Sequence, residues 1–161
     1  MSLKDIRKLG DPVLREVAKA IERNEIGSLT PHIDKMFALI SEFRARYGRG
    51  RAIAAPQIGL TKRLICIDTG KRYILINPQL KPVGEEMMEI WDDCMSFPNL
   101  LVKVRRFKKV SVTFRDTDWN LHEWLLDSDE AELLQHEYDH LDGILAVDRA
   151  IDRDSFRWTE D

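Results

Sequence analysis

The 161-residue sequence predicts an α+β fold in which small antiparallel sheets pack around one central helix. Two observations support this class. Short apolar or alternating segments separated by turn residues occupy the region 64–126 and predict a series of β-strands. Longer segments with apolar residues at helical spacing lie on either side of that region and predict two helices, of which the second is the central one. The length fits a single domain over residues 1–161.

The first helix is predicted to begin at Thr30-Pro31, because a capping residue is followed there by proline at the first helical position. Apolar residues then recur on one side of the helix. They are Ile33, Phe37, Ile40 and Tyr47. Gly48 directly follows the last of them, so it is expected to end the helix.

Six β-strands are predicted between the two helices, from segments rich in β-branched, aromatic or alternating apolar residues. Turn residues such as Thr69-Gly70 and those at 116–118 separate these segments. The predicted strands span residues 64–68, 73–77, 87–91, 101–104, 110–114 and 124–126.

The central helix is predicted to begin after Asp127, an N-cap residue that has Glu130 at the capping-box position. Gly143 is expected to end it. Its apolar side comprises Ala131, Leu133, Leu134, Leu141 and Ile144. This pattern places the helix in the core, so the polar residues on its buried side need a partner or a function.

The most informative motif is the pentapeptide 136–140 (HEYDH) on this helix. His136 and His140 are four residues apart, so they share one face and lie close enough to bind one divalent metal ion. Glu137 could take a proton from a water molecule that the metal activates. The pattern predicts a metal-dependent hydrolase, although the same string also arises by chance in acidic helices whose histidines only pack or face solvent.

A catalytic metal site of this kind needs a third protein ligand and one position open to water. One class of proteases would place a histidine at position 146, which is Ala146 here. The remaining candidates are His32, His122, Cys66 and Cys94. Cys66 lies in an apolar run and is expected to be a core thiol. Cys94 follows two aspartates in a mixed segment without core periodicity, so it fits a ligand better.

Around Cys94 the sequence resembles the peptide deformylases, metalloenzymes that remove the formyl group from the N-terminal methionine of new bacterial proteins. Three motifs of that family occur in order. The glycine-rich motif matches residues 50–57 (GRAIAAPQ), the cysteine motif matches 92–96 (DDCMS), and the histidine motif matches 135–143 (QHEYDHLDG). The opening at 11–15 (DPVLR) is also similar, so the resemblance covers nearly the whole chain.

The resemblance implies that Cys94, His136 and His140 bind one divalent metal ion and leave its fourth position for water. Iron(II) is the usual native metal of the family, and zinc, nickel or cobalt can occupy the site in purified protein. The residue types alone favour zinc. Gln135 and Asp139 would support the ligands, since ligating histidines usually donate their second ring N–H to a neighbour.

Three catalytic roles also follow from the resemblance. Glu137 would accept the proton of the attacking water and pass it to the leaving amine. The side-chain amide of Gln57 and the backbone N–H of Met95 would donate hydrogen bonds to the formyl oxygen as it gains negative charge, each worth about 3 kcal/mol. Gln57 could instead be an ordinary polar loop residue.

The resemblance implies a substrate groove lined by Gly50, Arg51, Ala52, Ile53, Asp92, Glu132 and Leu133. This groove contains departures from the family pattern. Ala52 replaces a glycine, so its methyl group would narrow the groove or forbid a positive φ. Asp92 and Asp93 replace a glutamate and a glycine, and the added negative charge could weaken substrate approach or change the metal preference.

Acidic residues on the central helix are a further departure. Glu132 and Asp129 precede His136 by four and seven positions and share its face, where the family walls the pocket for the methionine side chain. An acidic wall fits methionine less well unless Arg51 or a lysine neutralises it. Both acids could instead be solvated first-turn residues that complement the helix dipole.

Composition limits the partners and the location of the chain. With Lys+Arg 25 against Asp+Glu 28 and a pI near 5.8, nothing favours nucleic acid or an anionic membrane surface. No apolar segment is long enough to span a bilayer. Two cysteines with different roles argue for a reducing cytoplasm. We therefore expect a cytoplasmic monomer that acts on N-formylated peptides. The acidic tail 152–161 lacks the basic helix by which some deformylases are thought to dock on the ribosome, which argues against ribosome contact.

Other functions stay open beside a formyl-methionine deformylase. A deformylase-like amidohydrolase for another N-formyl compound would cleave small formyl amides without preferring formyl-methionine. A catalytically impaired metal-binding homologue would hold metal and stay inert, although intact Glu137 and Gln57 argue against it. A zinc endopeptidase fits the histidine motif alone, but the missing third histidine argues against that class.

Overall fold

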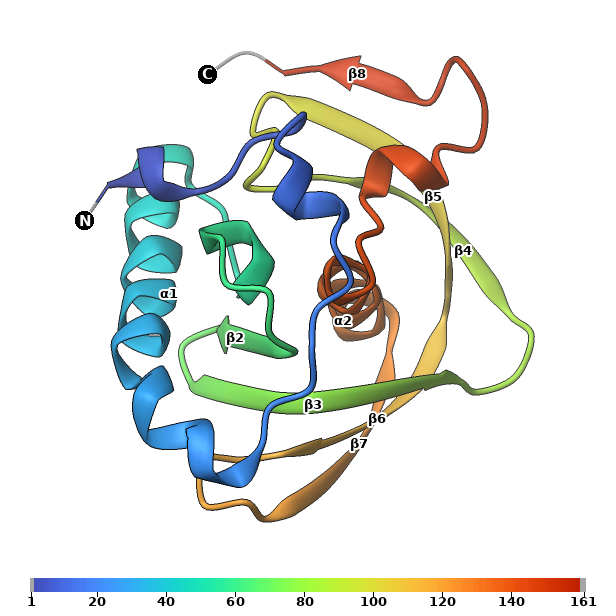
Figure 1. The fold of residues 1–161 in the computed structure, drawn as a ribbon. Coiled ribbons are helices and arrows are strands. Elements are labelled where there is room, and N and C mark those ends of the chain that lie inside the picture. The colour runs from blue at the N-terminus through green and yellow to red at the C-terminus, as the bar shows by residue number, and fades with distance from the viewer. Residues whose placement is uncertain (1, 160–161) are drawn as a thin grey trace.

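The computed structural model describes residues 2–159, and Figure 1 shows two β-sheets that curve around the helix α2 (Ser128–Leu141). The larger sheet has five strands in the order β1-β2-β3-β6-β7, and the smaller has three in the order β4-β5-β8. All neighbouring strands in both sheets are antiparallel. The predicted α+β class is therefore confirmed.

The elements of the described chain have the following bounds. The strands are β1 (Ala52–Ala54), β2 (Leu64–Asp68), β3 (Arg72–Pro82), β4 (Met87–Asp92), β5 (Leu100–Phe107), β6 (Lys109–Arg115), β7 (Leu121–Asp127) and β8 (Phe156–Trp158). The other long helix is α1 (Ile26–Tyr47). Short 3-10 helices lie at Leu3–Asp5, Pro12–Arg15, Arg23–Glu25, Ala55–Ile58 and Ala146–Arg149.

All six predicted strands are present, and β2 has the predicted bounds. β3 is longer than predicted, because it continues past Asn77 through a register shift between Ile76 and Gln79. Asn77 has a φ of 51° there, which breaks the regular alternation on which the prediction relied. β1 and β8 were not predicted, because three residues are too few to show a periodic pattern.

The predicted start of α1 at Thr30 is wrong. The short turn Arg23–Glu25 leads directly into α1, which begins at Ile26 and contains Pro31 in its second turn. Pro31 therefore removes one hydrogen bond near the helix start, to the carbonyl of Gly27, instead of marking the first helical position. The predicted end is confirmed, since Gly48 follows the helix with a left-handed φ of 73°.

The five-stranded sheet is covered by a helix on each face, and β2 shows why its sequence is apolar throughout. Leu64 and Cys66 belong to the apolar cluster that contains the buried side of α1, including Ile33 and Ile40. Ile65 and Ile67 point to the other face, where they join the cluster that contains Ala131, Leu134 and Leu141 of α2. The second cluster fixes α2 against this sheet, and strands of both sheets contact the helix.

The ends of α2 agree with the prediction in position but not in every contact. Asp127 is the N-cap residue, but its side chain makes no cap hydrogen bond to the backbone. The Asp127 carboxylate instead accepts a hydrogen bond of 2.7 Å from the Ser128 hydroxyl. The predicted capping box, which needs a bond from the Asp127 side chain to the helix backbone, is therefore wrong. Gly143 follows the helix with a φ of 73°, and a Cβ there would lie 2.5 Å from the carbonyl oxygen of Arg15. Ile144 lies beyond the helix end.

Within residues 2–159, no helix combines the length and the apolar composition that crossing a membrane requires. The tail contributes the exposed edge strand β8 beside β5, and residues 160 and 161 of the predicted acidic tail lie outside the described residues.

Candidate metal centre and active site

Three side chains converge at the buried face of α2. Cys94 comes from the turn after β4, and His136 and His140 come from successive turns of α2. One ligand atom of each lies within 4.8 Å of those of the other two, and Cys94 Sγ lies 3.4 Å from His140 Nε2. All three residues are buried. One sulfur and two imidazole nitrogens are typical donors of zinc and iron sites, so this triad could hold one metal ion.

The other candidates from the sequence lie elsewhere. Cys66 is fully buried in the core, as expected, and burial raises the pKa of its thiol. His122 lies on β7, hydrogen bonds to Asp116 at 2.7 Å and stacks on Phe114. His32 lies on α1 and is not part of the triad.

Asp92, the last residue of β4, holds His136 in place. Its Oδ2 lies 2.9 Å from His136 Nδ1 and accepts a hydrogen bond of 2.8 Å from Arg106. Burial alone would raise the pKa of Asp92, but His136 and Arg106 lower it to about 2. Burial also opposes protonation of His136, yet Asp92 and Cys94 outweigh it and raise the pKa of that ring well above its usual value. Because Nδ1 is used by Asp92, Nε2 of His136 is left for the triad.

The predicted support of the histidines by Gln135 and Asp139 is wrong. Gln135 exchanges hydrogen bonds with the backbone of Phe107, at 2.9 and 2.8 Å, and so ties α2 to the end of β5. Asp139 accepts a hydrogen bond of 2.7 Å from Arg106 and forms an ion pair with Arg149. Both residues therefore hold the helix in position rather than orient a ligand.

Arg106 supports the site and was not predicted from the sequence. Its side chain is 2% exposed and joins Asp92 of β4 to Asp139 of α2. The pattern of β5 contains a signal for it, because Val102, Val104 and Arg106 alternate on the buried face of that strand. An arginine at the third buried position of such a pattern needs carboxylate partners, and the structure supplies two.

Glu137 lies beside the triad and is 4% exposed. Its Oε1 has no hydrogen-bond partner among the described residues. Burial raises its pKa to about 7, with the Asp92 and Glu132 carboxylates adding to the effect and His136 opposing it. A buried carboxyl group with a pKa near neutrality can both accept and release a proton.

Gln57 is buried, and its amide has a fixed orientation. Its Oε1 accepts a hydrogen bond of 2.9 Å from the backbone N–H of Ala54, so its Nε2 is the donor end. Nε2 lies 3.2 Å from Ser96 Oγ and 3.5 Å from Cys94 Sγ. The structure therefore places the amide donor next to the triad, which agrees with a site residue and not with a polar loop residue.

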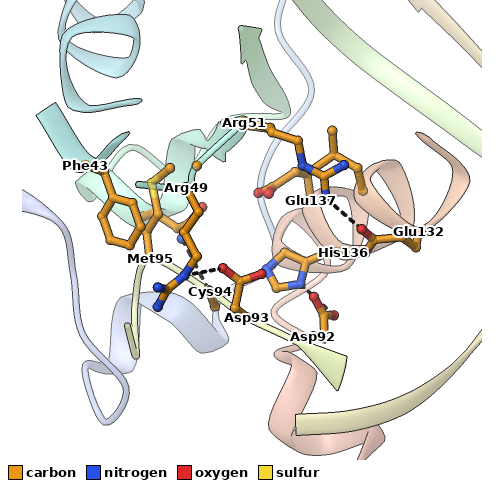
Figure 2. A pocket seen from close by; sticks show the side chains of 14 residues that line it. Phe43, Arg49, Arg51, Asp92, Asp93, Cys94, Met95, Glu132, His136 and Glu137 are labelled. Carbon is orange, nitrogen blue, oxygen red and sulfur yellow. Dashed lines mark hydrogen bonds and ion pairs between the residues drawn. The ribbon is translucent and has the colours of Figure 1, made fainter. Parts of the chain in front are cut away.

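A cavity of about 190 Å³ opens beside the triad. Figure 2 shows side chains from α1, α2, the β1 segment and the turn after β4 around it. Its lining residues are Phe43, Arg49, Gly50, Arg51, Ala52, Gln57, Asp92, Asp93, Cys94, Met95, Glu132, Leu133, His136 and Glu137. The structure thus brings together almost all the predicted site residues.

The glycine-rich segment forms one wall of this cavity. Gly50 has a φ of 129°, and a Cβ there would lie 3.0 Å from Phe43 and 3.1 Å from Met95. Ala52 lies in β1, so the expected conflict with a positive φ is absent and its methyl group only narrows the cavity. The Ile53 side chain does not line the cavity, because it is fully buried in the core cluster with α1. A substrate could reach only the backbone of Ile53.

Two ion pairs border the cavity (Figure 2). Arg51 donates to Glu132 at 2.7 Å, and Arg49 donates to Asp93 at 2.9 Å. The Glu132 side chain is only 13% exposed, so the interpretation of Glu132 as a solvated residue is wrong, whereas Asp129 is exposed. Burial and Asp92 raise the pKa of Glu132, and Arg51 opposes this shift.

Comparison with known proteins gives the family. The family model described as polypeptide deformylase matches residues 3–156. The chain belongs to this family. It is 32% identical to the peptide deformylase of Leptospira biflexa over an alignment of 173 positions, which covers 100% of this chain and 95% of that protein. The peptide deformylase of Heliobacterium modesticaldum is 38% identical over 154 residues, and the alignment covers 92% of this chain and 95% of that protein.

Solved structures of the family have the same fold. The crystal structure of peptide deformylase from Thermotoga maritima matches with a TM-score of 0.82 at 32% identity, covering 91% of this chain and 97% of that one. A peptide deformylase from Synechococcus elongatus in complex with actinonin matches with a TM-score of 0.83 at 33% identity. The match covers 92% of this chain and 79% of that one. The chain is thus an enzyme of the peptide deformylase family with the family's α+β fold.

Proposed function

We propose that the protein is a metal-dependent hydrolase that removes the N-formyl group from the N-terminal methionine of newly made polypeptides. One observation carries the proposal: Cys94, His136 and His140 converge at a cavity that also contains the buried carboxyl group of Glu137. Family membership supports the reaction, and this convergence supports the choice of the residues that we propose to perform it.

The triad fits a divalent metal ion. Burial and the neighbouring His136 lower the pKa of His140 well below its usual value, which favours the neutral, ligating form of its ring, whereas His136, whose pKa is raised, would release a proton when the metal binds. Asp92 holds the His136 ring through Nδ1, as an orienting partner of a ligating histidine does. When bound, the metal would polarise the formyl group and activate water. Iron(II) is the metal we propose for the native enzyme, with zinc, nickel or cobalt as possible substitutes.

Glu137 would act as the general base and then as the general acid. Its carboxylate accepts a proton from the attacking water, and its carboxyl group returns that proton to the nitrogen that leaves as the C–N bond breaks. In the metal-free protein the pKa of Glu137 is about 7, so neither form of the carboxyl group is strongly disfavoured at neutral pH. Glu137 Oε1, which has no hydrogen-bond partner within residues 2–159, is available for this exchange.

The formyl oxygen gains negative charge during the attack, and two groups of the chain could stabilise it. The Nε2 donor of Gln57 is held toward the triad by the bond between its Oε1 and the backbone of Ala54. The backbone N–H of Met95 follows Cys94 directly in the same turn. Such donors are typically worth about 3 kcal/mol each in the transition state.

The peptide part of the substrate would lie along the glycine-rich segment. β1 is an edge strand of the five-stranded sheet and borders the cavity through Gly50, Arg51 and Ala52. An extended peptide can pair with such an edge and place its N-terminal end at the triad. Gly50, Arg51, Ala52, the Ile53 backbone, Asp92, Glu132 and Leu133 are the residues we propose to contact the substrate.

The test is release of formate from formyl-Met-Ala by anaerobically purified protein loaded with iron or nickel. Glu137→Ala is the blank, because it removes the base and leaves the three ligands. The proposal requires turnover that this variant abolishes. Absence of turnover from protein that carries one bound metal per chain would contradict it. The monomeric state and the cytoplasmic location are part of the proposal and need separate measurements.

A further inference from the structure

Ser96 is a buried neighbour of Gln57 that does not itself line the catalytic cavity. It is 1% exposed and is absent from the lining residues. Its Oγ lies 3.2 Å from Gln57 Nε2, and because Nε2 is the donor end of that amide, the hydroxyl oxygen accepts the hydrogen bond. Within residues 2–159 this is the only hydrogen bond of the Ser96 hydroxyl. The hydroxyl can therefore act on the reaction only through Gln57.

Two hydrogen bonds fix the Gln57 amide at its two ends. Its Oε1 accepts from the backbone N–H of Ala54 at 2.9 Å, and this bond alone would let the amide pivot about the oxygen. The bond from Nε2 to Ser96 is a second fixed point and removes that freedom. Nε2 carries two hydrogens, so one is left over. Nε2 lies 3.5 Å from Cys94 Sγ, so this remaining donor is held beside the triad.

Backbone contacts hold Ser96 in place against Gln57, although the two residues are 39 positions apart in the chain. The backbone N–H of Arg7 donates to the carbonyl of Gln57 at 2.7 Å, and that of Leu9 donates to the carbonyl of Ser96 at 2.9 Å. One short N-terminal segment thus ties both residues together. The backbone N–H of Ser96 also donates to Cys94 Sγ at 3.5 Å. These contacts do not involve the Ser96 hydroxyl, so a truncation to alanine leaves them intact.

We infer that Ser96 is a positioning residue for deformylation, whose hydroxyl holds the Gln57 amide with its free N–H directed at the formyl oxygen. This inference rests on the proposed function and deepens it. An oxyanion donor stabilises the transition state only when it is already oriented, and a displacement of about 1 Å can cost about 10²-fold in rate. The charge on the formyl oxygen develops during the attack, so a loosened amide lowers kcat and leaves KM nearly unchanged.

The test is a double-mutant cycle on formate release from formyl-Met-Ala by the metal-loaded protein. Ser96→Ala should lower kcat about tenfold with KM within twofold, and it should cause no further loss in the Gln57→Leu background. The matched control is Ser155→Ala. Ser155 is also 1% exposed, its hydroxyl bonds to Asp152 at 2.9 Å, and it does not line the cavity, so kcat should not change. A loss below twofold, a loss that persists in Gln57→Leu, or an equal loss in the control overturns the inference.

The mobility of the Gln57 amide gives a readout that needs no turnover. Nitrogen-15 relaxation of the side-chain amides in the zinc-loaded protein compares Gln57 with Gln135, which is bonded at both ends, and with the exposed Gln79. The order parameter of Gln57 should match that of Gln135 in the wild-type protein and fall toward that of Gln79 in Ser96→Ala.

This readout separates the inference from the proposed function. If the wild-type protein hydrolyses no formyl-Met-Ala, the proposed function fails and the order parameters alone decide. A Gln57 amide that is unchanged in Ser96→Ala overturns the inference. A wild-type Gln57 amide as mobile as that of Gln79 also overturns it, whether or not the Ser96→Ala protein folds.

Discussion

Replacing Asp92 by asparagine removes one charge from the buried group that joins β4, β5 and α2. Asp92 Oδ2 contacts both His136 Nδ1 and Arg106, at 2.9 and 2.8 Å, and Arg106 is 2% exposed. After the substitution, Arg106 keeps Asp139 as a partner at 2.7 Å. Breaking a buried pair typically costs 3–5 kcal/mol, and because one partner remains we expect a loss near the lower end, about 3 kcal/mol.

The same substitution should weaken metal binding. Asparagine can present its amide N–H₂ to His136 as well as its oxygen, so the ring is no longer held with Nε2 toward the triad. Loss of such an orienting partner typically lowers metal affinity 10–100-fold. Zinc titration of the metal-free protein with a competing chelator measures this affinity. Asp93→Asn is the matched control, since Asp93 is 39% exposed and its surface pair with Arg49 contributes less than about 1 kcal/mol.

The pH dependence of unfolding gives an independent measure of the Asp92 charge. In the metal-free protein the pKa of Asp92 is lowered from 3.8 to about 2, so its stabilising contribution is fully present above pH 3.8 and is lost as the pH falls through about 2. Wild-type protein in chelator should therefore lose stability over this window more steeply than Asp92→Asn. If Asp92→Asn unfolds at the same urea concentration as Asp93→Asn and binds zinc equally well, Asp92 does not hold His136 as described.

Three further predictions follow from the site. Glu137→Gln should lower kcat for formate release by about 10²–10⁴-fold while one metal per chain is retained, and loss of the metal would point to a structural role instead. Gln57→Leu should lower kcat by about 10²–10³-fold with little change in KM; a change of kcat below threefold would remove Gln57 from the oxyanion site. Gly50→Ala should cost more than about 1 kcal/mol in urea unfolding, because the added Cβ is strained at a φ of 129° and meets Phe43 at 3.0 Å. Gly70→Ala is its control and should cost less, because the φ there is 102° but an added Cβ would meet no atom of the described residues beyond its chain neighbours within 4 Å.

The metal triad could be predicted because its spacing is local on α2 and because Cys94 lies in a recognisable motif. His136 and His140 must share a helix face whatever the rest of the chain does. The strand β2 was predicted with its bounds for a similar reason, since both of its faces are buried and the whole run is apolar. At these positions the local sequence pattern and the packing in the folded chain require the same structure.

The contacts that support the triad could not be predicted, because they join elements far apart in the chain. Asp92 precedes His136 by 44 positions, and the arginine that joins it to Asp139 lies on a third element. The sequence suggested Gln135 and Asp139 as supports because they are neighbours of the histidines. On a helix, however, adjacent residues point in different directions. Glu132 was similarly ambiguous until Arg51 was placed opposite it.

The central claim is that one metal ion, held by Cys94, His136 and His140, is required for deformylation. It is tested most directly by adding nickel in small steps to metal-free protein and following formate release from formyl-Met-Ala after each step. We predict that activity rises in proportion to added metal and stops rising at one equivalent per chain, and that Cys94→Ala shows no such rise. Activity in the metal-free protein, or a rise that continues well beyond one equivalent, would contradict the account.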